Sequence, residues 1–127
     1  MRRLKIVLVE DSVLLQEMVT EVIESMPKTE LVGVAATEEA ALSTIAKNHP
    51  DLVVVDLQLK EGDGLGVLRA LYSQSKKYGD PKKVVFTNNT SKGLKSRCEA
   101  LGIEGYFDKS YQLDDLTDYV SSLSASS

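Results

Sequence analysis

Five side chains able to take part in chemistry stand at, or just beyond, the ends of short apolar runs in this sequence. They are Glu10, Asp11, Asp56, Thr87 and Lys109. Carboxylates gathered in one place repel one another, by roughly 4 kcal/mol for a pair about 4 Å apart at an effective dielectric constant near 20. A divalent cation would remove that repulsion, and oxygen ligands of this kind suit Mg²⁺ or Mn²⁺. The residue types therefore indicate a metal-assisted reaction, provided that the fold brings them together.

A carboxylate in such a cluster could attack a phosphorus centre and form an acyl phosphate. In the transition state, negative charge spreads over three equatorial oxygens. The cation would neutralise one of them and the ammonium group of Lys109 a second, while the hydroxyl of Thr87 and nearby backbone N–H groups would serve the third. An aspartate, a metal, a lysine and a threonine are thus sufficient for transfer of a phosphoryl group to a side chain.

The elements that must position these groups are five apolar runs that alternate with segments of helical periodicity. The expected strands are residues 5–9, 31–35, 52–56, 84–87 and 104–107. After each strand, apolar residues recur every three or four positions, as in Leu94, Cys98 and Leu101. Five strand–helix units predict an α/β fold, a doubly wound parallel sheet of the (βα)5 flavodoxin-like type with strand order 2-1-3-4-5. In that order the carboxyl ends of the strands bring the five side chains to one edge.

The composition narrows the class of protein. The 127 residues fit one compact domain, which we expect over residues 1–123, followed by a frayed Ser-rich tail at 124–127. The net charge of −4 argues against a nucleic-acid partner. The single cysteine, Cys98, suits a reducing compartment, and no run approaches the roughly 20 apolar residues of a membrane helix. We therefore expect a cytoplasmic protein that binds neither nucleic acid nor membrane.

One basic stretch invites a functional interpretation and is better explained structurally. Four lysines surround Pro81: Lys76, Lys77, Lys82 and Lys83. Such clusters are usually solvated, so we expect these four side chains in an exposed loop rather than at a binding site.

The chain resembles the receiver domains of response regulators in two-component signalling. The resemblance extends from about residue 6 to residue 123. It rests on the stretches Leu8-Val9-Glu10-Asp11-Ser12, Asp51-Leu52-Val53-Val54-Val55-Asp56, Gly62-Asp63-Gly64, Val85-Phe86-Thr87 and Gly105-Tyr106-Phe107-Asp108-Lys109. Each stretch alone is weakly specific, but five in this order and spacing are strongly specific.

The resemblance implies a protein that takes a phosphoryl group from a phosphohistidine on a sensor histidine kinase or a histidine phosphotransfer protein. Asp56 would be the phospho-acceptor, and Lys109 and Thr87 would contact the transferred group. The implied ligands of Mg²⁺ or Mn²⁺ are Asp11, Asp56, the backbone carbonyl of Gln58 and, indirectly, Glu10. Such a protein is not an enzyme for other substrates, because it catalyses only its own phosphorylation and dephosphorylation.

The resemblance also implies how the signal is passed on. Thr87 and Tyr106 would form a switch pair, in which the hydroxyl turns to the phosphoryl group and the ring moves inward. Gln58 and Asn89 occupy positions that tune hydrolysis of the acyl phosphate. The message would leave through the face formed by the helix around Leu94, the strand 104–107 and the last helix. With no segment after that helix, we expect a stand-alone receiver that signals by protein contact or acts as a phosphate shuttle or sink.

Three positions depart from the family's usual residues. Lys60 and Ser110 stand where the family usually has proline, and Asn88 stands where it usually has a small residue. These departures slightly favour a rival interpretation, an inactive receiver-like module that only docks. A flavin-binding electron carrier on the same sheet would need a Ser/Thr/Gly-rich phosphate loop in place of the acidic pair after the first strand. A nucleotide hydrolase would need a Gly-x-x-x-x-Gly-Lys-Ser/Thr stretch, which the sequence lacks.

Overall fold

The computed structural model describes residues 2–89 and 91–126. Its five parallel strands form one sheet in the order β2-β1-β3-β4-β5, which confirms the predicted flavodoxin-like topology. The strands are β1 (Leu4–Val9), β2 (Thr29–Ala35), β3 (Leu52–Val55), β4 (Lys82–Thr87) and β5 (Gly105–Asp108). The helices are α1 (Val13–Glu24), α2 (Glu38–Asn48), α3 (Gly64–Ser73), α4 (Ser75–Tyr78), α5 (Lys92–Ala100) and α6 (Leu113–Ser126). In the described part of the chain, no helix is long and apolar enough to cross a membrane.

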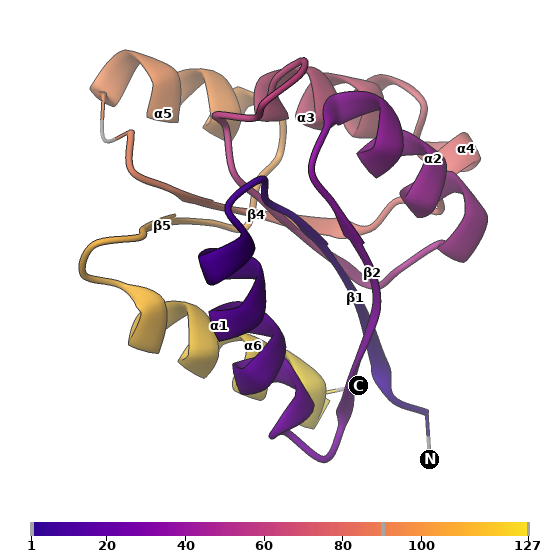
Figure 1. Ribbon diagram of the computed structural model, residues 1–127. Coiled ribbons are helices and arrows are strands. Elements are labelled where there is room, and N and C mark those ends of the chain that lie inside the picture. The colour runs from indigo at the N-terminus through magenta and orange to yellow at the C-terminus, as the bar shows by residue number, and fades with distance from the viewer. Residues whose placement is uncertain (1, 90, 127) are drawn as a thin grey trace.

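The helices cover both faces of the sheet (Figure 1), with α1 and α6 on one side and α2, α3, α4 and α5 on the other. Alternate residues of each central strand therefore enter different cores. In β3, Val53 and Val55 pack beneath α2 and α3, whereas Leu52 and Val54 pack against α1 and α6. Because neither face meets water, the strand is apolar at every position, which is the pattern that made it recognisable in the sequence.

Four helices that begin at the edge of the sheet where the strands end each have a polar side chain that caps the N-terminus. The caps of α1, α2, α3 and α5 each accept a hydrogen bond from the backbone N–H three residues later; they are Ser12, Thr37, Asp63 and Ser91. Each cap satisfies one of the free N–H groups of the first helical turn. The loops at this edge are thus held by the starts of rigid helices.

A short helix and the end of the chain differ from the sequence prediction. The four-residue helix α4 was not predicted, because so short a segment shows no helical period; buried Tyr78 anchors it, and Gly79, with φ of 80°, ends it. The frayed tail predicted at 124–127 is the second difference. In the structure α6 continues through Ser126, and Ser124, four residues after the buried Val120, is buried as well. Ser127 lies outside the described residues.

The prediction of an exposed loop that carries four lysines is wrong, because Lys76 and Lys77 lie in α4 and Lys82 and Lys83 lie in β4. Three of these side chains are exposed as predicted, but Lys83 is buried. Lys83 is 6% exposed, and its ammonium group lies 5.8 Å from the centre of the Tyr72 ring. Burial lowers the pKa of Lys83 from its ordinary 10.5, against the opposing charges of Asp80 and Glu104.

We expect Lys83→Met to raise the free energy of unfolding at pH 7 by about 1 kcal/mol or less, because the charged amine then no longer has to be buried. The lowered pKa means that the folded state prefers the neutral amine. At neutral pH the folded state therefore bears the free-energy cost of burying a charged Lys83. This cost disappears as the pH rises toward 10.5, where Lys83 also loses its proton in the unfolded chain. Urea unfolding at pH 7 and pH 10 tests this, with exposed Lys82→Met as the control. A gain in the free energy of unfolding that is equally large at pH 7 and at pH 10 would contradict this explanation.

Candidate functional site

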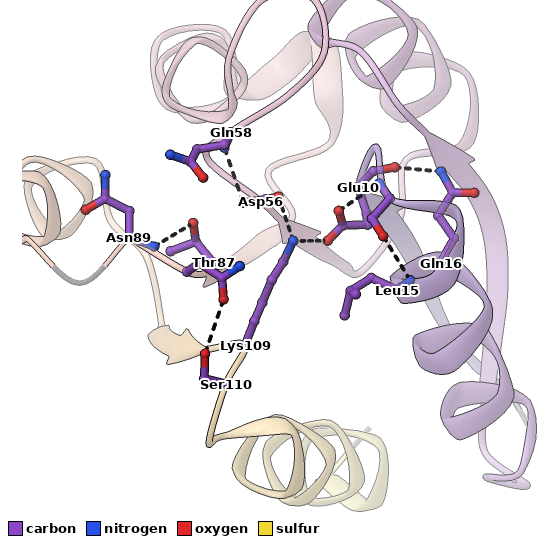
Figure 2. A network of polar contacts seen from close by, with 11 residues as sticks. Glu10, Leu15, Gln16, Asp56, Gln58, Thr87, Asn89, Lys109 and Ser110 are labelled. Atoms are coloured by element: carbon purple, nitrogen blue, oxygen red, sulfur yellow. Dashed lines mark hydrogen bonds and ion pairs between the residues drawn. The ribbon is translucent and has the colours of Figure 1, made fainter.

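The charged residues singled out in the sequence meet at the carboxyl edge of the sheet. Oxygen atoms of Glu10, Asp11 and Asp56 lie within 4.8 Å of one another. Figure 2 shows the side chain of Lys109 reaching between two of these carboxylates. Its Nζ is 2.6 Å from Glu10 Oε1 and 2.7 Å from Asp56 Oδ2. The fold thus joins the ends of β1 and β3 and the loop after β5 in one charged cluster.

The cluster is buried, and Lys109 compensates part of its charge. Glu10 is 1% exposed and Asp56 4%. Burial raises the pKa of Glu10 above its ordinary 4.5, although hydrogen bonds from Lys109 and from the Ser12 N–H oppose that rise. Burial alone would lower the pKa of Lys109, but hydrogen bonds to Asp56 and Glu10 outweigh it and raise that pKa above 10.5. Lys109 therefore stays an ammonium group, and one such group beside three carboxylates leaves the site acidic.

The loop between β1 and α1 fixes the acidic pair. Ser12 caps α1 and its N–H donates to Glu10 Oε2 at 3.0 Å, so the half-buried Asp11 is not needed as the helix cap. Gln16 reaches back from α1 and donates from Nε2 to the Glu10 carbonyl at 2.6 Å. The sequence did not reveal this role of Gln16, because nothing in the spacing of residues shows that its partner is a backbone atom.

The two ends of the loop between β3 and α3 approach each other closely. A side chain at Gly64 would place its Cβ 2.1 Å from the Asp56 carbonyl oxygen, so the close approach requires glycine. Next to Gly64, Glu38 of α2 accepts from the Asp63 N–H at 2.9 Å, a contact that the sequence also did not indicate. At the β3 end of the loop the exposed Gln58 donates from its N–H to Asp56 Oδ1 at 3.2 Å. The backbone of Gln58 therefore lies directly beside the Asp56 carboxylate.

One residue of the loop after β4 bonds to both members of the predicted switch pair. The N–H of Asn89 donates to the hydroxyl oxygen of Thr87 at 3.3 Å, and its carbonyl accepts from the Tyr106 hydroxyl. Thr87 is fully buried, whereas Tyr106 is half-buried with Lys95 Nζ 5.9 Å from its ring centre. Burial raises the pKa of Tyr106 above 10.0, so its hydroxyl keeps its proton as a donor.

The three unusual positions lie around this edge without preventing its assembly. Ser110 Oγ lies 3.5 Å from Asn88 Oδ1, a long contact between the loops after β5 and β4, and Lys60 is exposed. The described residues contain no cis peptide bond, so Lys109 is followed by a trans bond to Ser110. Lys109 nevertheless reaches both carboxylates, with its own N–H donating to the Thr87 carbonyl at 3.1 Å.

The donor set fits a hard divalent cation. Three carboxylates with oxygens in mutual reach are typical of Mg²⁺ or Mn²⁺ sites that also retain water ligands. Beside them stand a carboxylate on Asp56, an ammonium group on Lys109 and a hydroxyl on Thr87. These are the groups needed to receive and stabilise a phosphoryl group.

Comparisons with known proteins point the same way. The family model of the response regulator receiver domain matches residues 6–121. A protein-glutamate methylesterase/protein-glutamine glutaminase of a Nocardioides species is 31% identical over 99 residues, which are 78% of this chain and 26% of that protein. This chain spans only part of the length of its curated relatives, from 20% of a methylesterase/glutaminase of Geobacter sulfurreducens to 35% of one of Clostridium acetobutylicum.

Solved structures share the whole fold. A two-component response regulator of the LuxR family from Aurantimonas sp. is 25% identical with a TM-score of 0.85, covering 98% of this chain and 86% of that one. The Mn²⁺-bound form of the response regulator Rcp1 is 27% identical with a TM-score of 0.76, covering 95% and 91%. Both similarities extend over nearly all the strands and loops that carry the acidic cluster.

Proposed function

This chain belongs to the response regulator receiver family, and from that premise we propose that Asp56 accepts a phosphoryl group from a phosphohistidine in a reaction that requires Mg²⁺ or Mn²⁺. The observation that carries the proposal is the contact of Lys109 with Asp56 inside the acidic cluster. It brings the Asp56 carboxylate, the Lys109 ammonium group and two further carboxylates into one small volume, which supports assigning them to phosphoryl transfer and metal binding. The donor would be a sensor histidine kinase or a histidine phosphotransfer protein.

In this reaction an oxygen of Asp56 forms a bond to phosphorus while the bond from phosphorus to the imidazole nitrogen of the donor breaks. Lys109 already contacts Asp56 Oδ2, so its ammonium group needs only a small movement to bind a phosphoryl oxygen. The Thr87 hydroxyl, at the end of β4, would donate to another.

The metal would be held by Asp11, Asp56 and the backbone carbonyl of Gln58, with Glu10 acting indirectly. When bound, it would neutralise charge on the transferred group. Two facts support this ligand set: the carboxylates of Glu10, Asp11 and Asp56 lie in mutual reach, and a relative 27% identical to this chain was solved in an Mn²⁺-bound form. The exposed side chain of Gln58 and that of Asn89 would tune hydrolysis of the product.

The signal would be passed from Thr87 to Tyr106 through the backbone of Asn89. If the Thr87 hydroxyl turns to a phosphoryl group, it gives up its bond with the Asn89 N–H, and the carbonyl that holds Tyr106 belongs to the same residue. The face formed by α5, β5 and α6 would then present the change to an unidentified downstream protein. If the chain acts instead as a phosphate shuttle or sink, the same site would accept the phosphoryl group, but no downstream protein would need to contact that face.

We propose no methylesterase or glutaminase activity for these residues, because the receiver match accounts for residues 6–121. The chain would catalyse only its own phosphorylation and dephosphorylation. A cytoplasmic location suits the single cysteine and a cytoplasmic kinase domain as donor. The net charge of −4 gives no support to a nucleic-acid partner.

Intact-mass analysis after incubation with acetyl phosphate tests the proposal. We expect one phosphoryl adduct in the presence of Mg²⁺ and none after removal of the metal with EDTA, because uncompensated carboxylates repel the anionic donor. Asp11→Asn removes a proposed ligand and should weaken Mg²⁺ binding, measured by calorimetry, by at least about 10-fold, since even residues that only support a ligand contribute about that much. A wild-type chain that binds Mg²⁺ but forms no adduct would favour the docking-only module.

A further inference from the structure

The loop that carries Lys109 is built around one residue, Asp108. Its Oδ1 accepts from the Ser110 N–H at 2.7 Å, and its own N–H donates to Gln112 Oε1 at 2.9 Å. Its carbonyl accepts from the N–H groups of Tyr111 at 3.3 Å and Gln112 at 2.8 Å. Asp108 therefore closes a tight turn in which both of its backbone polar groups and one carboxylate oxygen are bonded.

This turn is anchored on two sides. The N–H of Lys109 donates to the Thr87 carbonyl at 3.1 Å, which ties the turn to β4. Gln112 Nε2 donates to Asp115 Oδ2 at 3.1 Å, which ties it to the first turn of α6. From this fixed backbone the Lys109 side chain, 10% exposed, extends to Glu10 and Asp56.

The bond from residue 110 to Asp108 requires a residue with an N–H group. Proline, which the resemblance leads one to expect there, has none. Ser110 supplies the donor, and the resulting Asx-type turn gives the loop a shape that depends on the Asp108 carboxylate.

We propose that Asp108 is a positioning residue for Lys109: by accepting from the Ser110 N–H, its carboxylate fixes the turn that aims the ammonium group at Asp56. The inference rests on the proposed function, because its effect is on phosphoryl transfer. Asp108 does not itself contact the reacting atoms, and its influence passes through Lys109.

Substitutions at position 108 separate the hydrogen bond from the charge. Asp108→Asn keeps an Oδ1 acceptor without charge, Asp108→Ser keeps a weaker one, and Asp108→Ala has none. We expect the rate of labelling by acetyl phosphate with Mg²⁺ to stay within about twofold for Asn, to be intermediate for Ser and to fall about tenfold for Ala. The control is Asp118→Ala, an exposed aspartate in α6, which should label like the wild type. A loss that is as large for Asn as for Ala would overturn the proposal.

A double-mutant cycle tests whether Asp108 acts through Lys109. In a chain that already carries Lys109→Ala, adding Asp108→Ala should reduce the rate no further, and a loss that multiplies would contradict the inference. Faster hydrogen exchange at the Ser110 amide in Asp108→Ala, but not in Asp108→Asn, is expected independently of labelling. If the wild type is not labelled at all, the proposed function fails. If it is labelled and Asp108→Ala is labelled equally fast, only this inference fails.

Discussion

Asp56→Asn is expected to abolish phosphoryl incorporation and to leave the fold intact. The amide is nearly the same size as the carboxylate but has no charged oxygen to attack phosphorus. It retains an oxygen to accept from the Gln58 N–H, and Lys109 keeps its contact with Glu10. We therefore expect the free energy of unfolding to change by no more than about 1 kcal/mol. Intact-mass analysis with acetyl phosphate and Mg²⁺ measures the adduct, and urea unfolding measures stability.

The matched control is Asp118→Asn, which makes the same chemical change on the exposed face of α6 and should be labelled like the wild type. An adduct of equal yield on Asp56→Asn would remove Asp56 from its proposed role. Loss of labelling in both variants would instead indicate an unspecific effect of lowering the negative charge.

Lys109→Met is expected to have the largest effect on stability. It removes the ammonium group from between Glu10 and Asp56, which are 1% and 4% exposed, and leaves their charges uncompensated. Removal of one partner from a buried ion pair costs about 3–5 kcal/mol. Labelling should also slow by about 100-fold or more, because one of the groups that stabilise the transferred charge is lost. Urea unfolding and the rate of adduct formation measure the two effects.

The difference in the free energy of unfolding between the wild type and Lys109→Met should decrease both at high pH and at low pH. The raised pKa of Lys109 means that its stabilisation is complete below pH 10.5 and is lost as the pH rises through that raised pKa. At the acid end, Glu10 takes up a proton as the pH falls through its own pKa, which burial raises above 4.5, and a neutral carboxyl group needs no counter-charge. The difference should therefore be greatest near neutral pH. A difference that is the same at pH 4, 7 and 11 would contradict the ion-pair explanation.

Mg²⁺ supplies a further check on the same variant. A cation that binds only the folded chain stabilises it in proportion to the logarithm of its concentration over its dissociation constant. We expect added Mg²⁺ to restore part of the lost stability in Lys109→Met, since it neutralises the same carboxylates. Exposed Lys60→Met, in the loop after β3, is the control and should change stability by less than about 0.5 kcal/mol with or without Mg²⁺.

The strand order was predictable from the sequence because a central strand that is covered on both faces forms a recognisable apolar run, although the edge strand β2 carries the exposed Glu30. The run 52–55 has no polar residue, and right-handed crossovers leave few ways to arrange five such strands. The helical period was less informative about how wide each buried stripe is. Met18 and Tyr72 follow Leu15 and Leu68 at helical spacing, yet they are 40% and 59% exposed, because periodicity gives the direction of the buried face but not its edges.

The charged part of the site was also predictable, since Glu10, Asp11, Asp56 and Lys109 stand where strands end, and parallel strands end together. The residues that hold this cluster in place were not. Gln16, Glu38 and Asp108 each bond to a backbone group, and any residue offers such a group. A side chain that bonds to a backbone group can have any residue type as its partner. The sequence therefore does not show which side chains do so, and only the structure identifies them.

The two bonds that Asn89 makes to the switch pair use its main-chain atoms alone. Its side chain is engaged elsewhere, where Oδ1 accepts from the Ser91 N–H at 3.0 Å. Under the proposed function, a substitution at position 89 could therefore lengthen or shorten the lifetime of the phosphorylated form while the main-chain route to Tyr106 stays in place. The duration of the signal and its transmission would then be separately adjustable, although both depend on the same residue.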